Sequence, residues 1–572
     1  MRTELKSVLW TMLAAVMVSC GREEILETTW VSTDIHFTDR MSIEEIEDAK
    51  TPAAFRHPAW KGERVWAQLL IRSIGEADGV RIRISDLKSA NDVIPAGNIE
   101  AGFVKYVMGD VFADSFSQCG KRPVGKFDSL MVADLVDNCE CIDLKDNALQ
   151  PVWVTVRIPG DAAAGHYEGR LTVKAKGARA RKVPFSIEVL DRRLPSPDEW
   201  KFYLDLWQNP YSVARYHNVE LWSKEHFDCM RPVMQKLADA GQKVITATIM
   251  NRPWDGQTED PYGSMVTKTL KTDGSWEYNY EVFDRWVEWM MSLGIDSYIN
   301  CYSMIPWKLE FDYYEEGCDT LRTMRAAPEE EAYSDYWAPF IKDFASHLKE
   351  KGWFGITRIA MDERPVERML DAIRVIRQAS PEMCISLAGG RHPEIEAELT
   401  DYCVSFLAEH PVPVSERRER GAISTWYTSC AERYPNTFTI SPLSEATWIG
   451  WRTLAADYDG YLRWAVNSWT ADPLTDTRFR TWCAGDTYMI YPEGRSSVRF
   501  DKLVEGIQDY EKMRILIDEW NAAGQLDKVA ELAGALSRFD YKHLSEAEDT
   551  GREASDAIEE GRRLYNRLSI EE

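Results

Sequence analysis

The chain has 572 residues, of which 44% are hydrophobic and 28% are charged, and its formal net charge is −25. This composition is typical of a globular protein with roughly two to four domains, and it excludes a disordered chain, a collagen and a polytopic membrane protein. The acidic balance argues against nucleic acid as a partner, because phosphate binding needs a basic surface. The chain has 22 tryptophans, and 16 of these lie in the segment from Trp200 to Trp482. This density favours either a site for flat apolar faces, such as sugar rings, or a large aromatic core.

Residues 1–20 predict an export signal. A basic start precedes an apolar run from Val8 to Val18, which is too short to span a membrane. The run ends in Val-Ser-Cys-Gly, which resembles a bacterial lipobox and makes Cys20 the lipidated first residue of the mature protein. A plain secretory signal is the alternative. We therefore expect a cell-envelope lipoprotein, on the outer membrane or the periplasmic face of a Gram-negative bacterium, whose only membrane contact is its lipid anchor.

The cysteines and histidines give no signal for a metal site. The ten cysteines after Cys20 include no CxxC pair, and the nine histidines include no HExxH motif. We therefore predict no metal and no cofactor, and we interpret most of the cysteines as small buried hydrophobic residues.

Residues 21–192 are predicted to form an all-β sandwich. Short segments with strand composition or alternating polarity recur there, separated by turn residues. The clearest are residues 65–71, 80–84, 152–156 and 169–173. The following stretch, residues 192–198, contains two prolines within three residues and is interpreted as a linker.

Residues 198–522 are predicted to form a (β/α)8 TIM-type barrel, because short apolar strands alternate there with amphipathic helices. The expected strands are residues 202–208, 243–250, 296–304, 357–362, 384–389, 401–407, 423–429 and 460–468. The expected helices include residues 224–240, 280–293, 334–351, 367–379 and 500–522. Residues 523–572 have helical spacing and are expected to form C-terminal helices packed against the barrel.

Two adjacent carboxylates, Asp362 and Glu363, end the fourth expected strand. In a barrel of this type, functional side chains gather at the carboxyl ends of the strands. Adjacent carboxylates repel each other, so one of them tends to hold its proton as a general acid requires. In hydrolysis of a 2-acetamido sugar, one carboxylate can hold the acetamido group while its neighbour acts as the acid. The alternative is a structural ion pair with Arg364.

At Asp362-Glu363-Arg364-Pro365 the chain resembles glycoside hydrolase family 123, the retaining β-N-acetylgalactosaminidases. The likeness extends to residues 204–208, 254–258, 347–353, 461–469, 485–488, 491–492 and 505–511. One departure is Val466, which stands where an aromatic residue is expected. The resemblance implies a substrate-assisted mechanism in which Asp362 orients the acetamido group and stabilises an oxazolinium-type intermediate. It also implies that Glu363 acts first as the acid and then as the base for water.

Further residues at or near the strand ends are candidates for substrate binding. Tyr302 or Tyr427 could donate a hydrogen bond to the acetamido oxygen, and Asn467 and Asp486 could bind sugar hydroxyls. Four tryptophans are expected to form apolar walls or stacking platforms, and they are Trp207, Trp426, Trp464 and Trp469.

Three functions are compatible with these residues. The first is an enzyme that releases terminal β-linked N-acetylgalactosamine from a glycan or glycolipid. The second is a β-N-acetylglucosaminidase with the same mechanism, because the chemistry depends only on the 2-acetamido group. The third is a surface lipoprotein that binds glycans without cleaving them.

Overall fold

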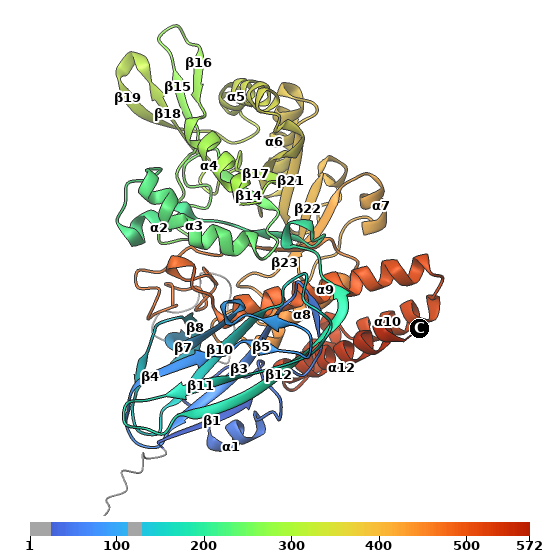
Figure 1. The fold of residues 1–572 in the computed structure, drawn as a ribbon. Helices are drawn as coiled ribbons and strands as arrows, with labels where there is room; N and C mark the ends of the chain where they lie inside the picture. Colours follow the sequence, from blue (N-terminus) through green and yellow to red (C-terminus); the bar gives the residue numbers. More distant parts are fainter. Residues whose placement is uncertain (1–24, 112–127, 572) are drawn as a thin grey trace, which may run out of the picture.

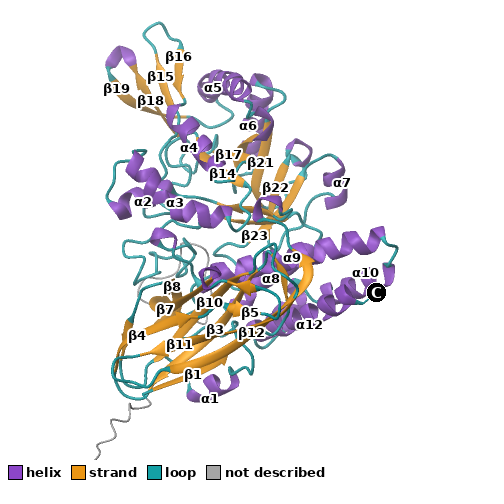
Figure 2. Cartoon of the chain, in the orientation of Figure 1, coloured by secondary structure: helices purple, strands orange, loops and turns teal. Residues whose placement is uncertain are grey.

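The computed structural model describes residues 25–111 and 128–571 (Figures 1 and 2). The predicted export signal and Cys20 lie outside the described residues. The described chain forms a sheet-rich N-terminal domain, a barrel and a set of C-terminal helices, which confirms the predicted fold class. No helix in residues 25–111 and 128–571 has both the length and the apolar character needed to cross a membrane.

The N-terminal domain consists of two packed sheets. One sheet has the order β1-β3-β10-β7-β8, with β1 Leu26–Val31, β3 Arg64–Ser73, β7 Ile99–Asp110, β8 Ser129–Asp137 and β10 Leu149–Arg157. The other has the order β2-β12-β11-β4-β9, with β2 Ala59–Lys61, β4 Ala77–Ile84, β9 Ile142–Leu144, β11 Gly165–Lys174 and β12 Arg181–Arg193. Short strand β5 (Leu87–Lys88) pairs with β11, and β6 (Val93–Ile94) pairs with β5; helix α1 spans Ile43–Asp48.

Alternating burial along the strands explains the sandwich. In β12, for example, Val183, Phe185 and Ile187 are buried, while the residues between them reach the surface more. Because β12 continues to Arg193, the two arginines at the start of the predicted linker belong to a strand.

Eight parallel strands form the barrel in the order β13-β24-β23-β22-β21-β20-β17-β14. All eight overlap the predicted segments. They are β13 Tyr203–Leu206, β14 Val244–Thr248, β17 Tyr298–Tyr302, β20 Thr357–Met361, β21 Cys384–Gly389, β22 Asp401–Ser405, β23 Ile423–Tyr427 and β24 Gly460–Arg463. Between β13 and β14 one backbone bridge, Leu204 to Gln242, is supplemented by side-chain hydrogen bonds. The N–H of Leu206 donates to Oε1 of Gln242 at 3.1 Å, and the N–H of Thr246 donates to Oε1 of Gln208 at 2.9 Å.

Helices cover the outside of the barrel (Figure 1). They are α2 Pro210–His217, α3 Lys224–Ala238, α4 Glu281–Ser292, α5 Glu331–Lys351, α6 Val366–Ala379, α7 Val414–Glu419, α8 Leu443–Ala455 and α9 Val498–Ala522. The C-terminal helices are α10 Leu526–Leu536, α11 Tyr541–Glu546 and α12 Thr550–Ile570. Helix α8 was not among the predicted helices. It approaches α9 closely at Gly450, where a Cβ atom would lie 2.1 Å from the carbonyl oxygen of Gly506.

A four-stranded sheet projects from the barrel at the top of Figure 1. Its order is β16-β15-β18-β19, with β15 Thr267–Leu270, β16 Trp276–Asn279, β18 Glu310–Glu315 and β19 Thr320–Arg325. One hairpin follows barrel strand β14 and the other follows β17, so the sheet joins two insertions at the carboxyl ends of neighbouring strands. This sheet was not predicted from the sequence.

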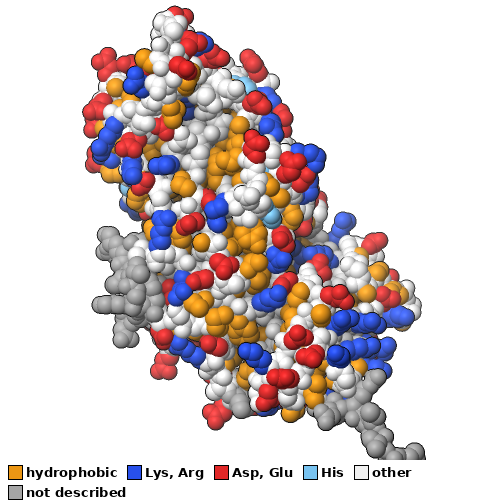
Figure 3. Space-filling view, turned by 90° about the vertical axis from the view of Figure 1, so that its left-hand side faces the viewer, with side chains coloured by type: hydrophobic (Ala, Val, Ile, Leu, Met, Phe, Trp, Pro, Cys, Tyr) orange, Lys and Arg blue, Asp and Glu red, His pale blue; other side chains and the backbone are white. Residues whose placement is uncertain are grey.

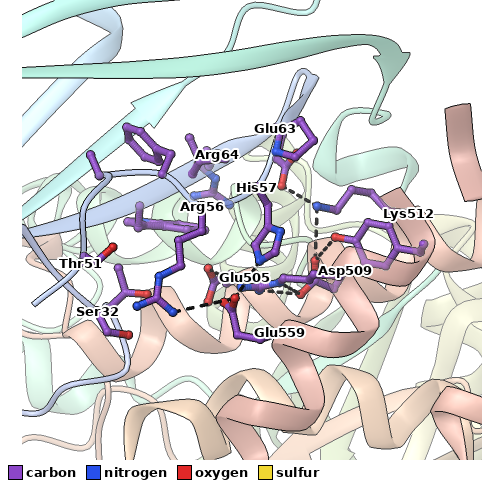
Figure 4. Close-up of a pocket in the computed structure, with 18 of the residues that line it drawn as sticks. Ser32, Thr51, Arg56, His57, Glu63, Arg64, Glu505, Asp509, Lys512 and Glu559 are labelled. Atoms are coloured by element: carbon purple, nitrogen blue, oxygen red, sulfur yellow. Dashed lines mark hydrogen bonds and ion pairs between the residues drawn. The ribbon is translucent and has the colours of Figure 1, made fainter. Parts of the chain in front are cut away.

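Buried ion pairs connect the sandwich to the helices of the barrel and the C-terminus (Figure 4). Lys512 on α9 lies 2.7 Å from Glu63 of the sandwich and 3.3 Å from Asp509, and Asp509 also pairs with Arg562 of α12 at 2.6 Å. The cavity among these groups holds only about 70 Å³. Because these charged side chains pair with one another, we assign them a structural role, which is to hold the sandwich against the helices.

Candidate active site

A cavity of about 690 Å³ opens at the carboxyl ends of the barrel strands. Its walls come from the ends of β13, β20, β23 and β24, from the loops after β14 and β17, and from the segment after β24. The side chains with the most chemical or stacking capacity there are Trp207, Trp254, Trp307, Asp362, Glu363, Tyr427, Trp464 and Trp482. Both carboxylates of the predicted pair therefore face one cavity, together with Trp207, Tyr427 and Trp464 from the predicted binding set.

Asp362 lies directly after β20 and is held from two sides. Its Oδ2 accepts a hydrogen bond of 3.0 Å from the indole N–H of Trp307, and its Oδ1 lies 3.4 Å from Nε of Arg364. Only 7% of its surface is exposed. Burial raises the pKa of this carboxyl above its ordinary value, while the charge of Arg364 and the Trp307 hydrogen bond act against that rise. Within the described residues, Oδ1 accepts no hydrogen bond.

Glu363 is the exposed member of the pair. Its Oε1 accepts a hydrogen bond from the phenol of Tyr427, which ends β23. Burial, together with the charge of Glu363, raises the pKa of Tyr427 well above its ordinary value, so the phenol keeps its proton. The two adjacent carboxylates therefore sit in different surroundings, one buried and anchored and the other open to the cavity.

Stacked aromatic rings form one wall of the cavity. Trp207 and Trp254 stack with their ring centroids 4.8 Å apart and their planes 28° apart. Tyr302 packs against both, with centroid distances of 4.5 Å and 5.1 Å, but it is only 1% exposed and lies behind the cavity lining. Tyr302 therefore supports this wall.

Trp464 reaches the cavity, and Asp486 holds it there. The indole N–H of Trp464 donates to Oδ1 of Asp486 at 3.3 Å, and the same oxygen pairs with Arg463 at 2.7 Å. Asp486 is fully buried and does not line the cavity. Its predicted contact with sugar hydroxyls is replaced by a contact with a tryptophan of the wall.

Trp426 points away from the cavity, into the layer between the barrel and its helices. Its indole N–H donates to Oγ1 of Thr453 on α8 at 2.9 Å, and its ring packs against Phe406 and Tyr461. Successive side chains of a strand face opposite sides, so Trp426 is turned outward because Tyr427 is turned inward. The predicted stacking platform at Trp426 is thus corrected to a core position.

Asn467 and Trp469 also lie outside the cavity, and both are fully buried. Oδ1 of Asn467 accepts the backbone N–H of Asn209 at 2.8 Å, and its amide donates to the carbonyl oxygen of the same residue at 2.8 Å. The indole of Trp469 donates to the carbonyl oxygen of Ile490 at 2.8 Å. These side chains fix the loops after β13 and β24, so the structure removes them from the predicted binding set.

Three cavity tryptophans, Trp254, Trp307 and Trp482, were not among the predicted site residues. Trp254 belongs to a segment that carried the family resemblance, which was a usable signal. Trp307 is 42% exposed and lies in a loop after β17, outside any regular pattern. Nothing in the sequence indicated its hydrogen bond to Asp362.

The described residues contain no cluster of three or more His, Cys, Asp or Glu side chains that could hold a metal ion. Eight cysteines in the described part of the chain form no disulfide, and three of them are buried. Cys430, which lines the cavity, is disulfide-bonded.

This arrangement suits acid-assisted cleavage of a sugar bond. A pair of carboxylates flanks one space, as glycoside hydrolysis requires, and aromatic faces surround it. The fixed carboxylate of Asp362 can accept a hydrogen bond from a ligand, while Glu363 is placed to exchange a proton.

Comparisons with known proteins match the chain to a family of glycoside hydrolases. Residues 207–516 match the family model "Glycoside hydrolase 123, catalytic domain", and residues 30–175 match "Glycoside hydrolase 123 N-terminal domain". A solved family 123 glycoside hydrolase from Clostridium perfringens, described in terms of glycolipid glycan hydrolysis, is 25% identical, with a TM-score of 0.83 and coverage of 95% of this chain and 97% of that one. A Bacteroides ovatus GH5 xyloglucanase is 8% identical, with a TM-score of 0.29 and coverage of 83% and 100%. The search of curated proteins found no match.

Proposed function

Because the chain belongs to glycoside hydrolase family 123, we propose that it releases terminal β-linked N-acetylgalactosamine from glycans or glycolipids with retention of configuration. The observation that carries this proposal is the difference in surroundings between two adjacent carboxylates at the end of β20. Asp362 is buried and anchored by Trp307, whereas the neighbouring Glu363 is exposed to the same cavity. The printed description of the C. perfringens relative, glycolipid glycan hydrolysis, supports a glycan of this class.

In the proposed first step, Glu363 gives its proton to the glycosidic oxygen as the bond from that oxygen to C1 breaks. The carbonyl oxygen of the substrate's own 2-acetamido group attacks C1 from the opposite face and forms an oxazolinium ring. Asp362 accepts a hydrogen bond from the acetamido N–H and stabilises the positive charge that develops on the ring. Trp307 and Arg364 keep the carboxylate oriented for this contact, which has to be made within a fraction of an ångström to be effective.

In the second step, Glu363 accepts a proton from water, whose oxygen attacks C1 and opens the ring. The two inversions restore the β configuration, and Glu363 returns to its protonated state. Trp207, Trp254 and Trp464 surround the sugar with apolar surface, which excludes water from the oxazolinium until leaving-group departure is complete.

The test is hydrolysis of paired aryl β-glycosides of N-acetylgalactosamine and N-acetylglucosamine. Wild type should cleave the galacto compound faster, and a thiazoline mimic of the oxazoline should inhibit competitively. Glu363→Gln and Asp362→Asn should each lower kcat by roughly 10²- to 10⁴-fold. Glu367→Gln, an exposed neighbour on α6, is the matched control and should behave as wild type. Equal rates in Glu363→Gln and wild type would contradict the assigned acid, and a faster gluco reaction would contradict the substrate.

We also propose that Cys20 is lipidated and holds the enzyme at the cell envelope. Support comes from the sequence alone, in the apolar run that ends at Cys20. Fractionation of cells that express wild type and Cys20→Ala tests this: wild type should remain with membranes, and the variant should move to the soluble fraction. Equal partitioning of both proteins would rule the anchor out.

A further inference from the structure

The hairpin between β11 and β12 is strongly basic, although the chain as a whole carries a net charge of −25. Residues 174–182 contain no acidic side chain, and their basic side chains are Lys174, Lys176, Arg179, Arg181 and Lys182. All of these except Arg181 are exposed. Because salt screens exposed charges beyond roughly 8 to 10 Å, such a cluster acts on its surroundings more strongly than distant acidic residues do.

The neighbouring strand β4 adds two basic side chains to the outer face of the same sheet. Lys174 lies directly opposite Arg81, and Thr172 lies between Lys182 on β12 and Arg83 on β4. Both arginines are exposed. Like charges on adjacent strands repel one another, so an anionic partner would relieve this repulsion. We call the group the basic sheet end, and it consists of Arg81, Arg83, Lys174, Lys176 and Lys182.

Acidic side chains on β11 and β12 lie toward the opposite end of these strands. Glu168 and Glu188 flank His166, whose ring nitrogens lie 3.5 Å and 3.4 Å from their carboxylates. Glu168 precedes Lys174 by six residues and Glu188 follows Lys182 by six, which corresponds to about 20 Å along each strand. The outer face of the sheet is therefore polarised, with positive charge at the hairpin and negative charge toward the barrel.

Acidic groups compensate the basic sheet end only weakly. Glu140, in the loop before β9, lies 3.4 Å from Arg81, but the two side chains are 84% and 55% exposed, and exposed pairs hold each other weakly. The backbone N–H of Lys176 donates to the carbonyl oxygen of Asp78 at 2.9 Å, which brings one exposed acidic residue to the hairpin. In the part of the chain that the structure describes, the three lysines of the basic sheet end form no ion pair. They are therefore available to an external anion.

The described chain begins beside this hairpin. The carbonyl oxygen of Leu26, the first residue of β1, accepts a hydrogen bond of 2.6 Å from Nε of Arg181. Cys20 precedes Leu26 by six residues, which span at most about 20 Å when fully extended. A lipid on Cys20 would therefore hold the hairpin within this distance of the membrane surface.

The barrel lies at the other end of the sandwich (Figure 1). Strand β12 runs from the hairpin to Arg193, just before the barrel, and its 13 residues span about 40 Å. Over the barrel, in the upper part of the face that Figure 3 shows, acidic and basic side chains are interspersed. The hairpin thus combines a single sign of charge with the position nearest the predicted anchor.

We propose that the basic sheet end binds the anionic headgroups of the membrane that holds the lipid on Cys20. Its lysine and arginine side chains face the lipid phosphates, and the barrel extends away from the surface. Each basic side chain near an anionic leaflet adds to the attraction, and one acyl chain by itself anchors a protein only marginally. This is a membrane contact beside the lipid, where the sequence predicted the lipid anchor alone. The inference rests on the proposed anchor and is independent of which sugar is cleaved.

The test is sedimentation with lipid vesicles of residues 20–572, the chain that the predicted cleavage leaves, produced without its lipid. This chain keeps every residue that the structure describes. Wild type should bind vesicles of equal parts phosphatidylglycerol and phosphatidylcholine, bind phosphatidylcholine alone far more weakly, and lose binding as salt is added. The combined variant Lys174→Gln, Lys176→Gln and Lys182→Gln should lower the partition coefficient on the anionic vesicles at least tenfold.

The matched control is the combined variant Lys224→Gln, Lys342→Gln and Lys542→Gln, which changes the net charge equally at exposed positions on α3, α5 and α11. It should bind as wild type does. An equal loss in both combined variants would attribute binding to net charge and overturn the proposal. So would a wild type that does not bind the anionic vesicles. Tighter binding of heparin than of these vesicles would assign the surface to an anionic polysaccharide instead of a membrane.

Lysine labelling tests the orientation in the lipidated full-length protein. On anionic vesicles, a soluble amine reagent should modify Lys174, Lys176 and Lys182 at least fivefold more slowly than in detergent, whereas Lys342 should react equally in both. Equal labelling of the three lysines on vesicles and in detergent would contradict the contact.

Two measurements separate this inference from the proposals on which it builds. All three proteins should cleave the aryl glycoside equally, and failure of all three would refute the proposed reaction while the vesicle result stands. Vesicle binding by wild type, combined with equal partitioning of wild type and Cys20→Ala in cells, would refute the anchor alone.

Discussion

The phenol of Tyr427 donates a hydrogen bond to Oε1 of Glu363 across the mouth of the barrel. The two residues come from β23 and from the end of β20, and strands β22 and β21 lie between them. Because Tyr427 keeps its proton, it is a permanent donor, and one oxygen of Glu363 is occupied by the protein. The other oxygen, Oε2, is then the atom that exchanges a proton with the substrate in the proposed mechanism.

Tyr427→Phe should lower kcat by roughly 10- to 100-fold, which is at or below the lower limit for a group that itself transfers the proton, and should leave KM nearly unchanged. The physical reason is that Glu363 can rotate once its Oε1 has no fixed donor. Steady-state kinetics on an aryl glycoside measures this. Tyr461→Phe is the control, because Tyr461 is fully buried, bonds to Thr428 and does not line the cavity. A drop in kcat of the same size in both variants would attribute the effect to packing.

Arg364→Gln should move the acidic limb of the kcat/KM profile to higher pH, by about one pH unit or more. Burial already raises the pKa of Asp362, and the positive charge of Arg364 opposes that rise. The mechanism needs Asp362 ionised, so activity is lost as the pH falls through its pKa, and removal of the opposing charge brings this loss at a higher pH. Arg374→Gln, on the exposed face of α6, should leave the profile in place. An unchanged acidic limb in Arg364→Gln would contradict the assignment of that limb to Asp362.

The barrel was predictable because its strands are short apolar segments between amphipathic helices, and this pattern directly reflects burial on both faces. The projecting sheet of β15, β16, β18 and β19 gives no such pattern. Only one face of the β18–β19 hairpin packs on the core, and the sheet is assembled from two hairpins far apart in the chain. Pairing between distant segments is set by tertiary contacts, which local sequence does not record.

The candidate site was predictable to the level of strand ends but not of side-chain direction. Trp426 and Tyr427 are neighbours, and only the orientation of β23 decides that the tyrosine enters the cavity. Trp464 and Trp469 differ in the same way, because one meets Asp486 at the cavity and the other meets Ile490 in the core. An aromatic residue near a strand end can therefore line the cavity or pack in the core, and composition does not distinguish these two positions.

Glu445→Gln should reduce the pH dependence of stability. Burial raises the pKa of Glu445 on α8 to about 8, against hydrogen bonds from Asn436 and Thr550. Because this pKa is higher in the folded state than in the unfolded chain, the wild type should lose stability as the pH rises from about 4.5 to about 8, at up to about 1.4 kcal/mol per pH unit. Thermal unfolding at pH 5 and pH 8.5 should show a smaller difference in Tm for the glutamine variant, and exposed Glu367→Gln is the control.

Trp464→Phe and Trp426→Phe should separate a cavity wall from the core. Trp464 lines the cavity and is held there by its hydrogen bond to Asp486. Replacement of Trp464 should therefore raise KM for an aryl glycoside with little change in Tm. Trp426 is 1% exposed and donates to Thr453, so its replacement leaves a void and removes one buried hydrogen bond, although the Thr453 hydroxyl still donates to the carbonyl oxygen of Ile449. Trp426→Phe should therefore lower the free energy of unfolding by about 1–3 kcal/mol and leave KM unchanged.

The two variants carry the same chemical change, so each serves as the control for the other. Unfolding in denaturant and steady-state kinetics should give opposite patterns in them. A raised KM in Trp426→Phe would place that ring against the substrate and contradict its outward orientation on β23. An unchanged KM in Trp464→Phe would mean that the sugar gains little from this wall, and the stacked pair of Trp207 and Trp254 would then have to supply the apolar contact by itself.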